Sequence, residues 1–188
     1  MVVLEDYKLA LEQMEQRLKA LDQELEALSQ SQPYRRWVGV LGCYRGVSTV
    51  TAMTILTELH GVERFTSPRQ LMAYLGLVPT EYSSGEKVAR GRITKAGNAH
   101  VRRVLIESAH HYRHAPSVGG TLAKRRQGQP PWAIALADKA QHRLNLRYRR
   151  LLMRGKPYGK IIVAIARELI GFLWATLQQQ SASQRQVA

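Results

Sequence analysis

Two adjacent serines followed by a glycine and several cations form the segment of this sequence that is best suited to chemistry. Ser83, Ser84 and Gly85 precede four basic residues: Lys87, Arg90, Arg92 and Lys95. A serine that attacks a phosphodiester needs a backbone that can approach the phosphate, which a neighbouring glycine permits. It also needs positive charge to stabilise the developing charge on the phosphate oxygens. The segment predicts either phosphoryl transfer by a serine or a turn that caps its own backbone.

The charge of the chain points to a polyanionic partner. Its 188 residues include 28 Lys and Arg but only 14 Asp and Glu, which gives a net charge of +14. Such an excess favours binding to nucleic acid or to an anionic membrane surface. The most apolar run, Ile161 to Leu177, contains Arg167 and Glu168 and is shorter than the roughly 20 residues that cross a bilayer. With no secretory signal visible, we expect a cytoplasmic protein that binds nucleic acid and has no contact with membranes.

The acidic residues do not form an evident metal site. After residue 30 they occur singly, at Glu58, Glu63, Glu81, Glu86, Glu107, Asp138 and Glu168. Because a two-metal nuclease holds Mg²⁺ with several carboxylates, the sequence predicts no metal or other cofactor in this chain. His110, His111 and His114 have a spacing that suits either a metal site or an exposed basic helix end. The single cysteine, Cys43, excludes an internal disulfide and a cysteine-based zinc site.

The first 30 residues differ from the rest in both charge and pattern. They carry a net negative charge, and their apolar residues alternate at spacings of three and four: Leu4, Tyr7, Leu11, Met14, Leu18, Leu21, Leu25 and Leu28. This a/d heptad pattern predicts a coiled-coil helix over residues 1–30 and a homo-oligomer formed through it. The alternative is a helix that packs on its own domain.

The remaining sequence predicts a mainly α fold. We expect short helices over 35–41 and 49–60, helices over 68–75 and from 99, and long helices over 132–153 and 160–177. The first two surround a glycine-containing turn and resemble a helix-hairpin-helix element, or else form an ordinary helical hairpin of the core. Residues 78–93 predict a long basic loop or loose hairpin, and 116–131 predict a second break. The domain therefore extends over 31–178, and the Gln/Ser-rich residues 179–188 predict a disordered tail.

Further cations extend the basic surface beyond the serine segment. Arg102 and Arg103 lie off the apolar stripe of the helix that follows residue 98, and the second break contains Lys124, Arg125 and Arg126. We predict that these residues bind nucleic-acid phosphates together with the cations near Ser84. For each one, the alternative is an ordinary solvated surface charge.

The segment from Leu71 to Asn98, LMAYLGLVPTEYSSGEKVARGRITKAGN, resembles the C-terminal domain of the insertion-sequence 110 transposase family. The preceding GVERFTSPRQ, Gly61 to Gln70, belongs to the same resemblance, which is strongest from Arg36 to Tyr112. It implies a DNA recombinase that uses a serine of this domain, and its Ser-Gly step corresponds to Ser84, with Ser83 as the neighbour.

The resemblance also implies components that this chain does not contain. Family members pair this domain with an N-terminal domain whose acidic tetrad binds Mg²⁺, and a structured RNA, the bridge RNA, guides their choice of DNA. We therefore expect Mg²⁺ in a separate N-terminal domain and a guide RNA as a partner. The chain then is a recombinase fragment or subunit that is inactive alone, or a non-catalytic module that binds nucleic acid and regulates a full-length transposase.

Overall fold

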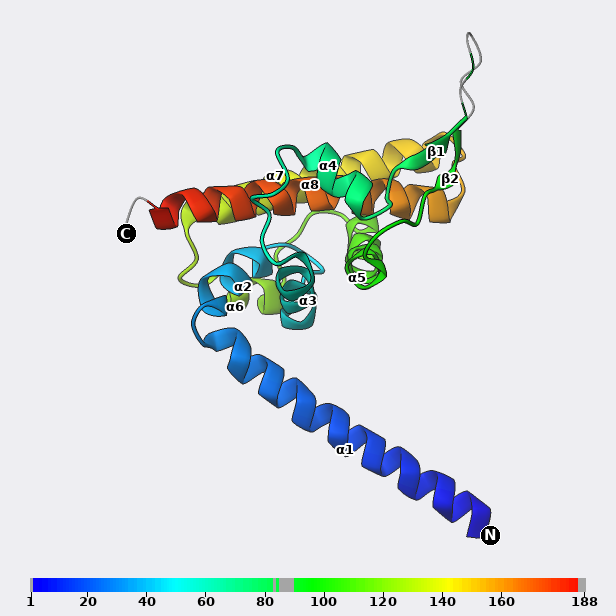
Figure 1. Cartoon of the computed structure of the whole chain (residues 1–188), viewed down its shortest axis with the longest axis vertical. Helices are drawn as coiled ribbons and strands as arrows, with labels where there is room; N and C mark the ends of the chain where they lie inside the picture. The colour runs from blue at the N-terminus through cyan, green and yellow to red at the C-terminus, as the bar shows by residue number, and fades with distance from the viewer. Residues whose placement is uncertain (1, 83, 85–89, 186–188) are drawn as a thin grey trace.

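The computed structural model describes all residues except 1, 83, 85–89 and 186–188. The described residues form a mainly helical protein with one small hairpin (Figure 1), which confirms the predicted fold class. In chain order the elements are α1 Val2–Gln30, α2 Tyr34–Gly42, α3 Thr49–Leu59, α4 Pro68–Tyr74, β1 Pro79–Glu81, β2 Arg90–Ile93, α5 Ala99–Ala109, the 3₁₀ helix η1 His110–Arg113, α6 Gly120–Arg126, α7 Pro131–Met153 and α8 Tyr158–Arg185.

Helix α8 is the central element of the core. It packs against α2, α4, α5 and α7, and its apolar residues Ile161, Ile165, Leu169 and Leu173 are fully buried. Over Tyr158–Ser183 the helix is long and apolar enough to cross a membrane by length and composition alone. Half of this window is buried inside the protein, as expected for the central helix of a helical domain.

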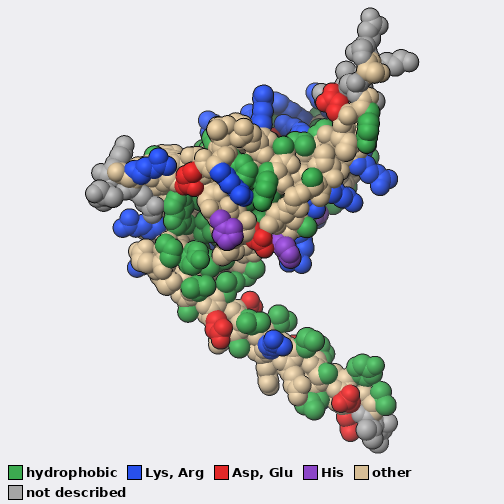
Figure 2. All heavy atoms as spheres, viewed as in Figure 1, with side chains coloured by type: hydrophobic (Ala, Val, Ile, Leu, Met, Phe, Trp, Pro, Cys, Tyr) green, Lys and Arg blue, Asp and Glu red, His purple; other side chains and the backbone are tan. Residues whose placement is uncertain are grey.

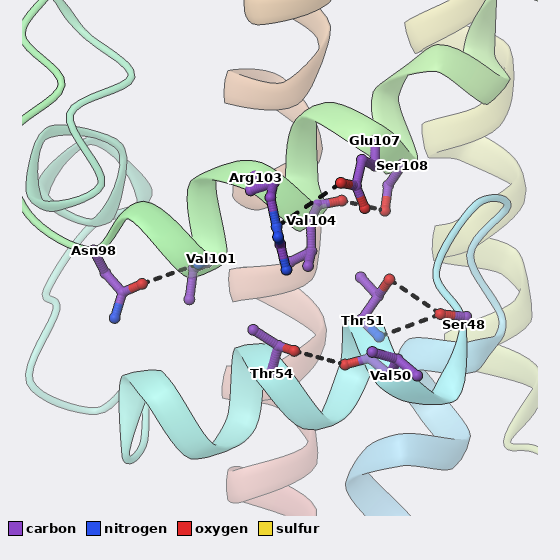
Figure 3. A network of polar contacts seen from close by, with 10 residues as sticks. All are labelled: Ser48, Val50, Thr51, Thr54, Asn98, Val101, Arg103, Val104, Glu107 and Ser108. Carbon is purple, nitrogen blue, oxygen red and sulfur yellow. Dashed lines mark hydrogen bonds and ion pairs between the residues drawn. The ribbon is translucent and has the colours of Figure 1, made fainter. Parts of the chain in front are cut away.

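Helices α2 and α3 form a compact pair joined by a short turn. Ser48 caps α3, because its Oγ accepts a hydrogen bond from the Thr51 backbone N–H at 3.2 Å (Figure 3). Ala52, Ile55 and Leu59 of α3 are buried, and Leu56 on the same face is partly buried. The two helices and the turn therefore form at the predicted positions. Phosphate binding by the turn stays a prediction.

Helix α1 extends away from the helical body, on the side opposite to the hairpin (Figure 1). Only its last turns contact α2 and α3, where Leu25 is partly buried and Ser29 is fully buried. The other seam residues are exposed, with fractions of 76% at Leu4, 61% at Leu18 and 47% at Leu28. The heptad pattern therefore lies on one continuous helix whose apolar seam has no partner among the described residues.

Two segments differ from the sequence-based prediction. The expected break at 116–131 contains α6, and α8 continues through most of the expected disordered tail to Arg185. The tail prediction is wrong for residues 179–185, because they continue α8 and the side chains of Gln180 and Ser181 are buried. Ser181 is buried and donates its hydroxyl to the Glu63 Oε1 at 2.6 Å. Residues 186–188 lie outside the described residues.

Candidate nucleic-acid interface

Strands β1 and β2 form an antiparallel hairpin that carries the candidate nucleophile. Pro79 pairs with Ile93 and Glu81 with Arg90, with an irregular register between them. Of the two predicted forms of this segment, the hairpin is therefore the one that forms. Ser84 follows β1 and is exposed.

Several predicted site residues lie outside the described part of the hairpin. Ser83 and Lys87 belong to the residues that the structure does not describe, and the side chain of Arg90 is also undescribed. The structure thus places Ser84 on an exposed hairpin but tests no contact between it and these neighbours.

The base of the hairpin is held closely against the end of α4. The Lys95 backbone N–H donates to the Gly76 carbonyl at 3.2 Å. Gly97 has a φ of +68°, and a Cβ at this position would collide with the Tyr74 carbonyl. Glycine is required here both for the left-handed backbone and for the close approach of the two segments.

Arg102 of α5 also stabilises the base of the hairpin. Its Nη1 donates to the carbonyls of Leu75 and Ala96, each at 3.0 Å. These two carbonyls belong to the segments on either side of the hairpin, so one guanidinium joins the two segments. Arg102 therefore positions the hairpin, whereas the sequence suggested direct phosphate binding.

Asn98 fixes the start of α5 next to this base. Its Oδ1 accepts the Val101 backbone N–H at 2.9 Å, which caps the helix (Figure 3). Its Nδ2 donates to the Glu58 Oε2 at 2.5 Å. The same side chain thus begins α5 and joins it to α3.

Exposed basic side chains lie on the hairpin, at its base and on α5. Arg92 and Lys95 are exposed. Arg103 forms an ion pair of 3.9 Å with Glu107 (Figure 3), with exposed side-chain fractions of 73% and 66%. Exposed pairs of this kind contribute about 0–1 kcal/mol, so Arg103 can exchange this partner for a phosphate.

The three basic residues of α6 have different environments. Lys124 is exposed, whereas Arg125 is half-buried and donates through Nη1 to the Val47 carbonyl. The Arg126 side chain is only 8% exposed, and its Nη1 lies 2.8 Å from the Asp138 Oδ1. Arg126 has a structural role, which differs from the surface role that the sequence suggested.

A row of arginines on α7 was missed by the sequence analysis. Four arginines line a hollow of about 290 Å³ together with Glu168 of α8: Arg143, Arg147 and Arg150 on α7, and Arg154 directly after its last residue. We call these four residues the α7 arginine row. Their spacing of four, three and four residues places them on one helix face, a signal that was visible in the sequence. Figure 2 shows Lys and Arg side chains gathered on the α7 side of the helical body, with few along α1.

A second hollow adjoins the first and reaches the start of the hairpin. It has a volume of about 580 Å³ and shares Arg143, Arg147 and Glu168 with the first. Its other walls are Pro68, Arg69, Met72, Val78 and Arg167. We call this second hollow the α4–α7 groove. Because Val78 directly precedes β1, the groove joins the α7 arginine row to the hairpin.

Other reactive side chains of the described residues do not form a competing centre. No three His, Cys, Asp or Glu residues come together there as metal ligands. Burial raises the pKa of Cys43 to about 11, so this thiol stays protonated near neutral pH. His110 hydrogen-bonds Tyr158 at 2.6 Å, and burial together with neighbouring cations lowers the pKa of His111.

Comparison with known proteins identifies the part of the chain that carries the hairpin. The sequence profile of the family described as Transposase IS116/IS110/IS902 matches residues 40–121. This span begins in α2 and ends in α6, so it includes the hairpin, its base and α5. The match agrees with the family resemblance of the sequence.

Relatives with curated names extend the similarity beyond this span. The protein y4qE of Sinorhizobium fredii, named as a candidate transposase, is 46% identical over 142 residues, which cover 76% of this chain and 36% of that protein. The transposase for insertion sequence element IS1533 of Leptospira borgpetersenii is 31% identical over 129 residues, 68% of this chain and 37% of the relative. The transposase for insertion sequence element IS1111A of Coxiella burnetii is 33% identical over 101 residues, 50% of this chain and 28% of the relative.

The chain spans about a third of the length of these relatives. Residues 40–121 thus match the IS116/IS110/IS902 family of transposases, and the chain is similar to named transposases over a longer span.

Proposed function

We propose that this chain binds DNA in transposition and that Ser84 attacks a DNA phosphodiester. The Ser84 Oγ forms a bond to phosphorus while the bond from phosphorus to one deoxyribose oxygen breaks. The serine loses its proton, and the released deoxyribose oxygen gains one, so the strand end becomes joined to the protein as a phosphoserine diester. The observation that carries this proposal is an exposed serine on a hairpin within the family-matched span.

The rigid base of the hairpin supports this role. A nucleophile must be held within a small range of positions relative to the phosphorus, and hairpins projecting into solvent move unless they are anchored. Arg102 and the close approach at Gly97 provide that anchor. The hairpin thereby presents Ser84 from a fixed point on the helical body.

In this proposal, exposed basic side chains bind the DNA phosphates. Arg92, Lys95 and Arg103 lie on the hairpin, its base and the following helix. Lys124 lies on α6 beside α2, and we propose that it binds a phosphate farther from Ser84. We include Lys87 and Arg90, because both follow Ser84 within six residues of the sequence. Each contact with a DNA phosphate releases counterions, so binding must weaken as salt increases.

Activation of the serine requires a component outside the described residues. A serine hydroxyl is a weak nucleophile at neutral pH unless a base or a metal activates it. The scattered carboxylates of the described residues do not fit a Mg²⁺ site, because no three potential ligands come together. We propose that an acidic Mg²⁺-binding domain supplies this function from a longer chain or in trans, and that a guide RNA selects the DNA.

Covalent trapping tests the catalytic proposal. The full chain is incubated with a nicked suicide DNA substrate and Mg²⁺, with and without an added N-terminal domain from a full-length relative. We expect a protein–DNA adduct only in the complete mixture, its loss in Ser84→Ala, and a much smaller effect of Ser83→Ala. An adduct that persists in Ser84→Ala would place the nucleophile elsewhere.

A non-catalytic regulatory module is the second candidate function, favoured by the exposed apolar seam of α1. In this case α1 pairs with the corresponding helix of a full-length transposase, and the basic body binds DNA without cutting it. The covalent trapping experiment distinguishes the recombinase from the regulatory module when the N-terminal domain and Mg²⁺ are present. A regulator lowers the adduct yield of a full-length relative as its concentration rises, and it forms no adduct through Ser84.

A further inference from the structure

We propose that the α7 arginine row is a second DNA-binding surface, which holds the backbone of duplex DNA next to the hairpin. The inference rests on the proposed DNA-binding function and adds a surface that neither the hairpin nor α5 provides. The row consists of Arg143, Arg147, Arg150 and Arg154, and the α4–α7 groove joins it to the start of β1.

The geometry of the row suits a DNA backbone. Arg154 directly follows the last residue of α7, so the eleven residues from Arg143 to Arg154 advance by roughly 16 Å at the helical rise of 1.5 Å per residue. Duplex DNA advances by about 3.4 Å per phosphate of one strand, so the row matches the length of about five nucleotides. A half-turn of DNA can therefore lie along α7 with several phosphates within reach of arginines.

Glu168 organises this surface without neutralising it. Its carboxylate contacts the Arg143 Nε and lies 3.0 Å from the Arg147 Nη1, while its own side chain is only 15% exposed. The Glu168 carboxylate thus positions the guanidinium groups of Arg143 and Arg147. Among the described residues, no carboxylate forms an ion pair with Arg150 or Arg154, and the row keeps a net positive charge.

Continuity with the hairpin favours DNA as the occupant. Val78 forms a wall of the α4–α7 groove and directly precedes β1, so a duplex bound near Ser84 can continue along this groove towards α7. Arginine guanidiniums also form paired hydrogen bonds with phosphate oxygens, which lysine ammonium groups do not. Arg69 of α4 lies on the opposite wall and adds a further charge.

Neighbouring residues on α7 provide a matched test. Arg150 lines the hollow, whereas Arg149 is equally exposed but points from another face of the same helix. Arg154 lines the hollow too, and Lys156 lies in the turn that follows α7. The double variants Arg150→Gln/Arg154→Gln and Arg149→Gln/Lys156→Gln therefore remove the same charge from two different surfaces.

Binding of the full chain to a fluorescent DNA duplex is measured by anisotropy over a range of salt concentrations. For Arg150→Gln/Arg154→Gln we expect the slope of log affinity against log salt to fall by about two, at about 0.9 per lost phosphate contact. We expect a change well below one for Arg149→Gln/Lys156→Gln. Circular dichroism melts identify any variant that fails to fold, and single substitutions then replace the doubles.

The outcomes distinguish failure of the α7 surface from failure of the proposed DNA-binding function. Equal slopes for the two double variants, with strong binding by the unmutated chain, would overturn the α7 surface but not DNA binding. Absence of salt-dependent DNA binding by the unmutated chain would overturn the proposed function itself. A duplex RNA of the same length is the comparison arm, and an effect of Arg150→Gln/Arg154→Gln on RNA but not on DNA would also overturn the assignment to DNA.

Discussion

The Arg126 Nη1 lies 2.8 Å from the Asp138 Oδ1, and the arginine is almost fully buried where α6 meets α7. The Arg126 Nε also donates to the Cys43 carbonyl at 3.0 Å. One guanidinium thus joins α6, α7 and the end of α2. One basic residue of a Lys-Arg-Arg sequence is therefore buried and joins three segments of the domain.

The first prediction follows from this contact. Arg126→Met leaves the buried Cys43 carbonyl without its donor and Asp138 without its partner, which we expect to lower the free energy of unfolding by about 1–3 kcal/mol. Lys124→Met, on the same short helix, removes an exposed charge and is the control, with an expected change within about 0.5 kcal/mol. Urea unfolding measures both. Equal stabilities of the two variants would contradict a structural role of Arg126.

The second prediction concerns the close contact at the hairpin base. Gly97 and Gly128 both have positive φ angles, of +68° and +70°, but only Gly97 faces a backbone carbonyl where a Cβ would be. Gly128→Ala therefore introduces backbone strain alone, of about 1–2 kcal/mol. Gly97→Ala adds the collision with Tyr74, for which we expect a further loss of about 1–3 kcal/mol. Urea unfolding of both variants separates strain from collision, and an equal loss would show that the base tolerates the added methyl group.

The third prediction concerns assembly through α1. We expect Leu18→Lys/Leu21→Lys to convert an oligomer into monomers, because it places charge in the apolar seam. Gln16→Lys/Gln23→Lys adds the same charge on the opposite face of the same helix and should leave the oligomer intact. Sedimentation velocity distinguishes the species. If the seam variant sediments like the unmutated chain, α1 does not mediate self-association.

The fourth prediction concerns pH and the end of α8. The hydroxyl of Ser181 is the main cause that lowers the pKa of Glu63 from its ordinary value of 4.5. Because the lowered pKa belongs to the folded state, the contact stabilises the protein above about pH 4.5, and this stabilisation is lost as the pH falls through the folded-state pKa. Ser181→Ala should therefore raise the pKa of Glu63.

Titration of the Glu63 side-chain carboxyl by NMR measures this shift directly. The control is Ser183→Ala, because the hydroxyl of Ser183 bonds only to the Gln179 carbonyl of its own helix. We expect the pKa of Glu63 to be unchanged in this control. A pKa that is also unchanged in Ser181→Ala would mean that α8 does not reach Glu63 in solution.

Local signals in the sequence were sufficient for most helices. The helix expected from residue 68 does begin there, because Ser67 caps α4 and Pro68 is its first residue, and both preferences act within one helical turn. Asn98 caps α5 for the same reason. The apolar stripe of α5 also packed as predicted, since Val101, Leu105 and Ala109 are all fully buried.

Features that depend on contacts between distant segments could not be predicted in this way. Nothing local distinguishes the buried Arg126 from the exposed Lys124, because the burial of Arg126 requires Asp138 and the end of α2. Likewise, the polar residues after Gln178 are typical of a disordered tail, because the sequence does not show that Ser181 contacts Glu63 in the fold. The α7 arginine row was detectable from its spacing, but its link to the hairpin depends on α4.

The attachment of α1 by its last turns alone makes this helix a rigid spacer of known length. Its 29 residues measure roughly 44 Å at 1.5 Å per residue. If two copies pair along their seams in parallel, both helical bodies lie at the same end and two DNA strands can be reached together. If they pair in antiparallel fashion, the bodies are separated by most of that length, so the direction of pairing determines the distance between the two copies of Ser84.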